Sequence, residues 1–236
     1  MTSLIIIAAA SIVLGFLINY ILSNVPKLKL AFQIILPIAI IFLAYFLYKG
    51  IETPIKFNHQ MEKRYKIVKE NLIDIRTAQI SYKSVKGTYA NNFDELINFV
   101  KHDSIQIIKA IGSIPDSLLD LGMMEEEAIR LGIIIREKSK VAVSDTLFPA
   151  DYKIDSIRYI PFSNGQEFQM GAGEITTGSN VKVKVFEAKA HYSTWLIGLD
   201  HQLIINLIDD RIVNELYPGL KVGDLEETNN NSGNWE

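Results

Sequence analysis

Two apolar runs near the start of the chain constrain its fold most, because neither contains an Asp, Glu, Lys or Arg: Leu4–Leu22 and Leu30–Tyr48. Each run has 19 residues, close to the roughly 20 that carry a helix across about 30 Å of hydrocarbon. The segment Ser23–Lys29 between them is too short for anything but a tight turn. The runs therefore predict an antiparallel transmembrane hairpin, residues 1–49, with the rest of the chain on the same side of the membrane as the N-terminus.

A cleaved signal peptide is the competing interpretation of the first run. It fits poorly, because no basic residue precedes Leu4, the run is longer than a typical signal-peptide core, and a second run follows at once. We therefore expect a two-pass protein of the inner (cytoplasmic) membrane in contact with membrane lipid. Asn19, Gln33 and Tyr45 are uncharged, which favours contacts between helices over an ion path.

The composition beyond Tyr48 excludes some classes of function. Its 22 basic and 27 acidic residues give a formal charge of −5, so nucleic acid is not an expected partner. Cys is absent, which excludes a disulfide framework and thiol catalysis.

A long amphipathic helix is expected next, within residues 50–84. The segment Gly50–Pro54 predicts a break after the second run, because proline lacks a backbone donor and restricts the residue before it. After the break, large or less polar side chains recur at heptad-like spacing. They form a candidate interaction seam: Phe57, Met61, Tyr65, Val68, Leu72, Ile75, Gln79 and Tyr82. Two interpretations remain open, a helix that covers its own domain and a self-associating coiled coil.

Residues 85–227 predict a mixed α+β domain with a small antiparallel sheet. A short helix with an asparagine cap is expected near Phe93, another near Ala128, and a polar, disordered tail over residues 228–236. Trp235 in this tail is a candidate for contact with a partner. Residues 196–199 and 203–208 are compatible with helix or strand. Strands are expected at three β-branched or alternating segments, Ile133–Ile135, Ile157–Ile160 and Val181–Phe186. Glycines 165, 171, 173 and 178 are expected in the connections between the last two of these strands.

One segment resembles a known family. The residues Ala78-Gln79-Ile80-Ser81-Tyr82, then Gly87-Thr88-Tyr89, then Phe93-Asp94-Glu95-Leu96 are similar to the part of type IV pilins and type II secretion pseudopilins where a long helix ends in an Ala-Gln-x-x-Tyr pattern. In that family a Gly-x-Tyr turn and a short helix follow. The resemblance implies a pilin-like helix packed on a mixed domain, in the setting of a secretion or pilus-like machine.

The same comparison limits what the resemblance implies. Pilins carry a basic leader and a single span with a Glu near its start, whereas the two apolar runs here contain no acid. Polymerisation and leader processing are therefore not expected. The overall plan, with a terminal Gly233-Asn234-Trp235, also resembles a group of two-span envelope proteins of Bacteroidota, which implies a cell-envelope setting but no activity.

No catalytic or metal-binding pattern stands out. The histidines are scattered rather than spaced as metal ligands, at positions 59, 102, 191 and 201. Gly171-Ala172-Gly173-Glu174 lacks the rest of a dinucleotide fingerprint, and no phosphate-binding loop motif occurs. Glu125-Glu126-Glu127 is typical of a solvated helix start. We therefore expect no catalytic residues, no metal and no cofactor, and hence no enzyme.

Three functions remain open. The first is a structural subunit that anchors and docks other envelope proteins, including copies of itself, which explains the anchor and the seam together. A tethered ligand- or peptide-binding module is the alternative, and an enzyme with an unrecognised site comes third.

The sequence gives two conflicting indications of which side of the membrane the domain lies on. Six basic residues between Lys49 and Lys69, against two in the turn, favour a cytoplasmic domain. The pilin resemblance favours an extracytoplasmic one, which we expect, since long domains translocate despite flanking charge.

Overall fold

The computed structural model describes Gly15, Asn19, Tyr20 and residues 26–236, of which the side chains of residues 26–33 and of Lys109 are not described. The chain divides into two compact units, residues 1–56 and residues 57–236. Most of the first apolar run lies outside the described residues. The predicted two-span hairpin is therefore not shown, and the segment Pro26–Lys29, expected in its turn, is helical.

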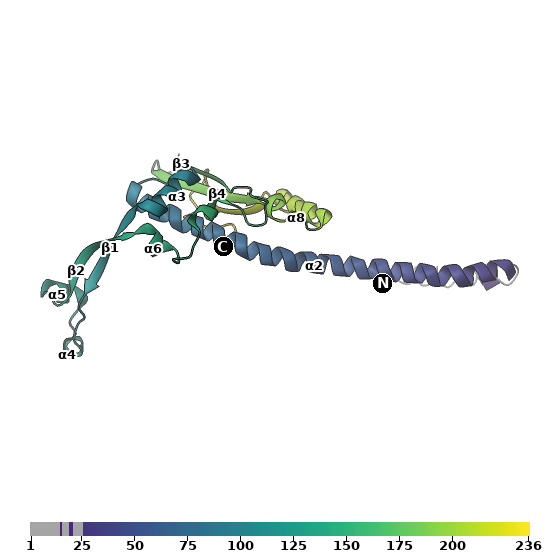
Figure 1. The fold of residues 1–236 in the computed structure, drawn as a ribbon, viewed down its shortest axis with the longest axis horizontal. Coiled ribbons are helices and arrows are strands. Elements are labelled where there is room, and N and C mark those ends of the chain that lie inside the picture. Colours follow the sequence, from purple (N-terminus) through teal and green to yellow (C-terminus); the bar gives the residue numbers. More distant parts are fainter. Residues whose placement is uncertain (1–14, 16–18, 21–25) are drawn as a thin grey trace. The chain divides into compact units, whose positions relative to one another are not determined.

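Helix α2 runs without interruption over Pro26–Lys86 (Figure 1). The predicted break at Gly50–Pro54 is wrong. Although Pro54 removes one backbone hydrogen bond, Glu52 lies one turn earlier and pairs with Lys56 Nζ at 2.6 Å and with the Tyr48 hydroxyl at 3.0 Å. Such pairs four residues apart add only about 0.2–0.5 kcal/mol each, less than the proline costs, but the helix nevertheless continues through Pro54.

The apolar part of α2 is long and hydrophobic enough to cross a membrane. Its most apolar stretch has a mean hydropathy of 2.2, and none of that stretch is buried within the protein. A core helix of a globular domain would be covered by its own chain, so this exposure indicates another apolar surrounding. The described residues thus contain one such helix, which is consistent with a membrane anchor or a signal sequence.

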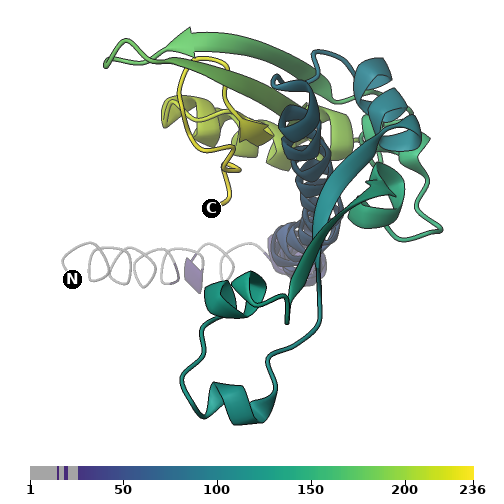
Figure 2. The same cartoon turned by 90° about the vertical axis from the view of Figure 1, so that its left-hand side faces the viewer.

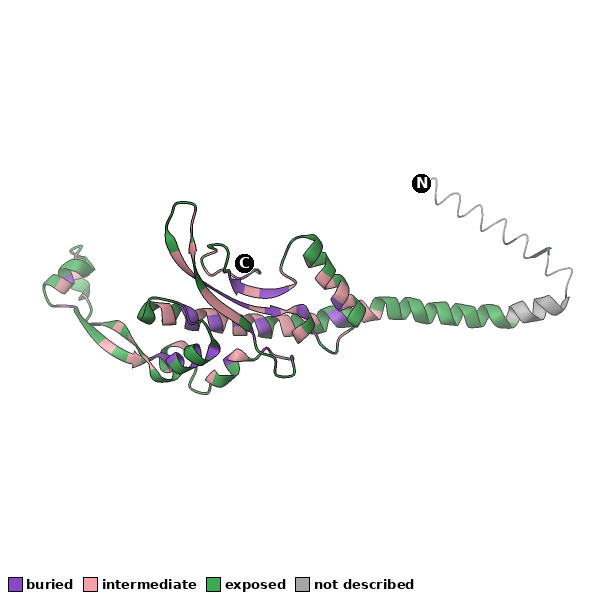
Figure 3. Cartoon of the chain, turned by 90° about the horizontal axis from the view of Figure 1, so that it is seen from above, coloured by how far each residue is buried: buried purple, intermediate pink, exposed green. Residues whose placement is uncertain are grey.

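The second half of α2 is the spine of the mixed domain, and its predicted seam faces inward (Figure 3). Phe57, Val68, Leu72 and Ile75 are buried in the domain core. Met61, Tyr65 and Tyr82 pack against that core, and Gln79 is fully buried. The helix therefore covers its own domain, as the first interpretation of the seam proposed.

A buried amide pairing sets the turn that follows α2. Gln79 Nε2 donates to the carbonyl of Ala90 at 2.9 Å, and Gln79 Oε1 accepts from the Ala90 backbone N–H at 2.9 Å. This pairing mimics one rung of a β-ladder and closes the Gly87-Thr88-Tyr89 turn onto the helix. The two motifs of the pilin-like segment are thus joined by a direct contact.

Helix α3, Phe93–His102, packs back along α2. Asn92 caps it as predicted: its Oδ1 accepts from the Glu95 N–H at 2.9 Å, while Glu95 accepts from the Asn92 amide and the Asn91 N–H. This arrangement resembles a capping box, with the backbone N–H of Asn91 in place of that of the cap residue Asn92. The rings of Tyr82 and Phe99 meet edge to face, 5.1 Å apart, which holds α3 on the spine.

Three antiparallel strands cover another face of α2 in the order β3-β4-β5: Gln169–Thr176, Lys182–His191 and Gly219–Gly223. The alternation at Val181–Phe186 correctly predicts the start of β4. Two other expectations are wrong. Gly171 and Gly173 lie inside β3, where the side chain of Leu225 covers them, and Ile157 belongs to a 3₁₀ turn, η1, Ile154–Arg158.

The segment after β4 contains two helices, and residues 196–199 between them, expected as helix or strand, form a turn. Helix α7 covers Tyr192–Trp195 and helix α8 covers His201–Val213, so the helix alternative holds for residues 203–208. Asp200 caps α8 by accepting from the Leu203 N–H at 3.1 Å. Arg64 of α2 donates to the carbonyls of Trp195 and Ile197, both at 2.9 Å, which ties this segment to the spine.

The predicted disordered tail is instead an ordered strap, residues 228–236. Gly233 bridges Val222 of β5, and Arg76 of α2 pairs with Glu236 at 2.6 Å. Trp235 packs against the domain core, with Lys69 Nζ 5.7 Å from its ring centre. The strap therefore covers the free edge of β5 and binds it to the spine.

The Gln79 pairing should dominate the stability of this domain. We expect Gln79→Leu to destabilise it by about 2–5 kcal/mol, because the backbone N–H and carbonyl of Ala90 lose their partners inside the core. Urea unfolding of the detergent-solubilised chain, followed by tryptophan fluorescence, measures the change. Gln60, exposed on the same helix, is the matched control, and equal stability of Gln79→Leu and Gln60→Leu would contradict the assignment.

The strap should protect the edge of the sheet. Removing residues 228–236 is expected to speed amide hydrogen exchange in β5, because the backbone contacts between Gly223 and Ser232 and between Lys221 and Asn234 disappear. The substitution Glu236→Gln, which breaks only a partly exposed ion pair worth up to about 1 kcal/mol, serves as the control. Unchanged exchange in the truncated chain would show that the strap does not stabilise β5.

Candidate docking site: the β1–β2 arm

A two-stranded arm leaves the domain between α3 and α6 (Figures 1 and 2). Strand β1, Ser104–Ile111, pairs antiparallel with β2, Ile135–Ala142, from Ser104 opposite Ala142 to Ile111 opposite Ile135. Helix α6, Val143–Leu147, follows β2 directly. A two-stranded ribbon has no second layer of its own to cover its faces.

The register gives the arm two chemically different faces. Side chains alternate along each strand, and directly paired residues share a face. One face is mostly apolar, with Ile105, Ile107, Val141, Ile111 and Ile135, although the same register positions include the Lys109–Glu137 pair and Ser139. Ile111 and Ile135, farthest from the domain, are 46% and 59% exposed. The ribbon therefore presents isoleucine side chains to solvent where no element of the described chain covers them.

The other face carries a basic stripe along β2. It consists of Arg136, Lys138 and Lys140, which occupy alternate positions and are exposed. Arg136 is paired within the arm, with Glu125 at 2.9 Å. Within the described part of the chain, Lys138 and Lys140 have no ion-pair partner.

The tip of the arm, residues 112–134, contains two short helices, α4 (Asp116–Leu119) and α5 (Glu125–Arg130). Ala128 and Ile134 are its buried residues. Four larger apolar side chains are at least half exposed: Leu119, Leu121, Met124 and Leu131. Five acidic residues and one arginine give the tip a formal charge of −4. Exposed large apolar side chains beside charged residues are typical of a protein-binding surface.

The sequence predicts only part of this site. Ser104–Ile111 contains four isoleucines in eight residues, a density typical of a strand. The helix predicted near Ala128 corresponds to α5, and the strand expected at Ile133–Ile135 begins only at its last residue. What the sequence did not reveal is that these elements leave the core and stay exposed.

The predicted interaction seam lies elsewhere, inside the domain. All eight of its residues are buried or packed against the core.

The isolated histidine His191 has a structural role. Its Nδ1 accepts from the Ser193 N–H at 3.2 Å and caps α7, and burial lowers its pKa. Among the described residues, no group of three or more His, Cys, Asp or Glu side chains could hold a metal ion.

One pair of titratable groups in the domain is strongly affected by burial. The Tyr152 hydroxyl donates to Asp74 Oδ2 at 2.7 Å. Burial raises the pKa of both Asp74 and Tyr152, and their hydrogen bond raises that of Tyr152 further. The pair ties α2 to the segment before η1, so we assign it to stability.

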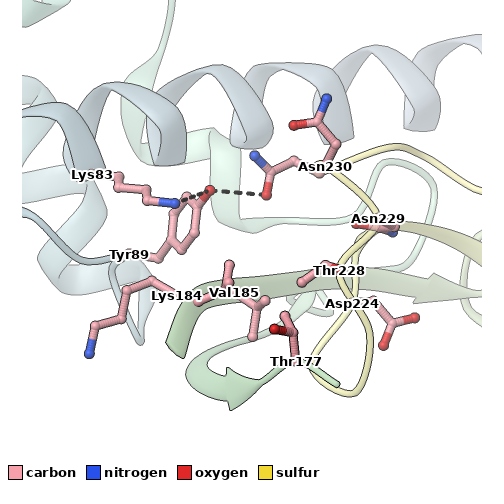
Figure 4. Close-up of a pocket in the computed structure, with 11 residues that line it drawn as sticks. Lys83, Tyr89, Thr177, Lys184, Val185, Asp224, Thr228, Asn229 and Asn230 are labelled. Atoms are coloured by element: carbon pink, nitrogen blue, oxygen red, sulfur yellow. Dashed lines mark hydrogen bonds between the residues drawn. The ribbon is translucent and has the colours of Figure 1, made fainter. Parts of the chain in front are cut away.

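A pocket of about 400 Å³ lies between the end of α2, the β3–β4 hairpin and the strap (Figure 4). The ammonium of Lys83 lies 3.3 Å from the Tyr89 hydroxyl, which donates to Asn231 Oδ1 at 3.0 Å. Lys184, Asp224 and Asn230 also line the pocket. Its central polar groups bond to one another, so it is a lesser candidate than the arm.

Comparisons with models of protein families, with curated proteins and with solved structures found no match to this chain. The arm and the pocket are therefore interpreted from their own chemistry.

Proposed function

We propose that this protein is a non-enzymatic integral membrane subunit that anchors and docks other components of a cell-envelope assembly, such as a secretion or pilus-like machine. The observation that carries the proposal is the arm, whose outer isoleucines, Ile108, Ile111 and Ile135, and whose tip are exposed although the domain has a well-packed core of its own. A sequence does not keep large apolar side chains in solvent for stability, because their exposure promotes association. The exposed apolar part of α2 supports the anchoring role.

A tethered ligand-binding module is the second candidate, and the pocket beside Tyr89 favours it. Two lysines, Lys83 and Lys184, would suit an anionic ligand. The pocket is open and its polar groups are already paired, whereas ligand sites are usually concave and apolar with a few unpaired polar groups. The docking function therefore explains more of the molecule.

Docking should depend on the arm tip. Replacing residues 112–134 by Asn-Gly joins Ile111 to Ile135, which are already opposite each other, through a favoured two-residue turn. We expect this shortened chain to remain folded and membrane-bound but to lose the high-mass complex formed by the intact protein. Blue native electrophoresis of gently solubilised membranes measures the change.

A milder variant serves as the matched test of the tip, with serine at Leu119, Leu121, Met124 and Leu131. These exposed residues contribute little to folding, so the same loss of the complex is expected. A complex of unchanged size in both variants would rule out docking through the tip.

We further propose that the domain is extracytoplasmic. Alkaline phosphatase fused after Glu236 through a flexible linker should then be active, because the enzyme folds only outside the cytoplasm, and a green fluorescent protein fusion should be dark. The reverse pattern, an inactive phosphatase and a fluorescent fusion, would place the domain in the cytoplasm, as the flanking lysines and arginines favour.

A further inference from the structure

We propose that the arm pairs with the arm of a second copy of this chain, with β1 of each copy side by side and antiparallel. This inference rests on the proposed docking function and names the partner of one part of the site. The result would be a four-stranded sheet in the order β2-β1-β1-β2 about a two-fold axis.

The two edges of the arm differ in a way that selects β1. Strand β2 carries Arg136, Lys138 and Lys140, and lysines on an edge are a common protection against strand addition. Strand β1 has a single charged residue, Lys109, among four isoleucines. Strand β1 pairs with no strand other than β2 within the described chain. Its outer backbone groups are therefore open to an added strand.

One register suits this pairing especially well. If Ile108, which is 63% exposed, lies opposite Ile108 of the partner subunit, then Ile105 lies opposite Ile111 of the partner subunit. The uncharged Gln106 and Ala110 also face each other. The mostly apolar faces of the two arms then join on one side of the sheet, the Ile108 pair lies on the other side, and isoleucine pairs across strands stabilise a sheet. A β2-to-β2 arrangement centred on Lys138 would instead place like charges opposite each other, which is unfavourable.

The charge along the arm favours an antiparallel partner of the same kind. The tip carries a formal charge of −4, and the two strands together carry +3. In an antiparallel pair, each acidic tip extends toward the base of the other arm, near which the unpaired Lys140 lies opposite Gln106. A two-fold interface must be self-complementary. Here the same contact between an acidic tip and a basic base would form twice, once from each copy of the chain.

The absence of cysteine from the sequence allows a direct test with single cysteines in the full-length chain in detergent. We expect a dimer by light scattering. In Ile108→Cys, the two sulfur atoms would meet at the axis, because directly opposite strand residues have Cα atoms about 4.5–5.5 Å apart, within disulfide range. Mild oxidation should therefore convert this variant to a covalent dimer.

Lys138→Cys is the matched control, because Lys138 is the partner of Ile108 within the arm and lies on the same face. It should not cross-link. A chain that is monomeric, or that cross-links equally at both positions, would overturn the proposal.

A charge-swap experiment tests the same axis without oxidation. Ile108→Lys and Ile108→Glu should each abolish the dimer, and an equimolar mixture should restore it through opposite charges. Dimers of unchanged mass in both single variants would overturn the β1 pairing.

The outcomes separate this inference from the docking function. If the protein is monomeric and its membrane complex still depends on the tip, only the proposed pairing between two copies is refuted. If the protein forms a β1-linked dimer but its complex on blue native gels does not depend on the tip, only the proposed docking of other components through the tip is refuted.

Discussion

The pairing of Gln79 with the backbone of Ala90 is the constraint on which the rest of the domain depends. It reverses the chain immediately after a 61-residue helix and so places α3 against the spine. Gln79 Nε2 also lies 3.2 Å from Met170 Sδ, which connects the same amide to β3. This buried contact therefore helps to position both the helix that supports the arm and the sheet on the other side, together with the Tyr82–Phe99 contact and the domain core. A fully buried amide is tolerated because both its donor and its acceptor are satisfied.

The inward position of the seam changes the meaning of the heptad-like spacing. Leu72 and Ile75 recur as they would in a coiled coil, but the surface they contact is the domain's own core. Spacing reports only that one face of a helix is buried and not which chain buries it. Any association between copies must therefore use another surface, and the arm is the described surface with exposed apolar side chains and a free strand edge.

Local patterns predicted the local elements well. The α+β class, the capped helix α3 and strand β4 follow from cap chemistry and from the alternation of Val and Lys. The errors arise where distant residues decide the outcome. Gly171 and Gly173 resemble turn residues, yet they lie in a strand paired with Glu187 and Val185 of β4, where the side chain of Leu225 covers them. The C-terminal residues are polar enough to suggest disorder, yet Arg76 and the domain core bind Glu236 and Trp235. Such contacts are invisible to any pattern read within one segment.

The arm illustrates the same limit in reverse. Ile105 at its base packs against the core, but Ile108, Ile111 and Ile135 are exposed although their sequence is typical of a buried strand. A strand rich in β-branched side chains predicts burial, and for an isolated ribbon that burial can come only from a partner. The ordering of residues 104–142 also costs conformational entropy that few contacts with the domain offset. A partner that covers the apolar face and pairs with the edge of β1 would supply the missing burial and the contacts that offset the entropy cost. The conflict between a core-like sequence and an exposed position is thus the strongest physical reason to treat the arm as one half of an interface.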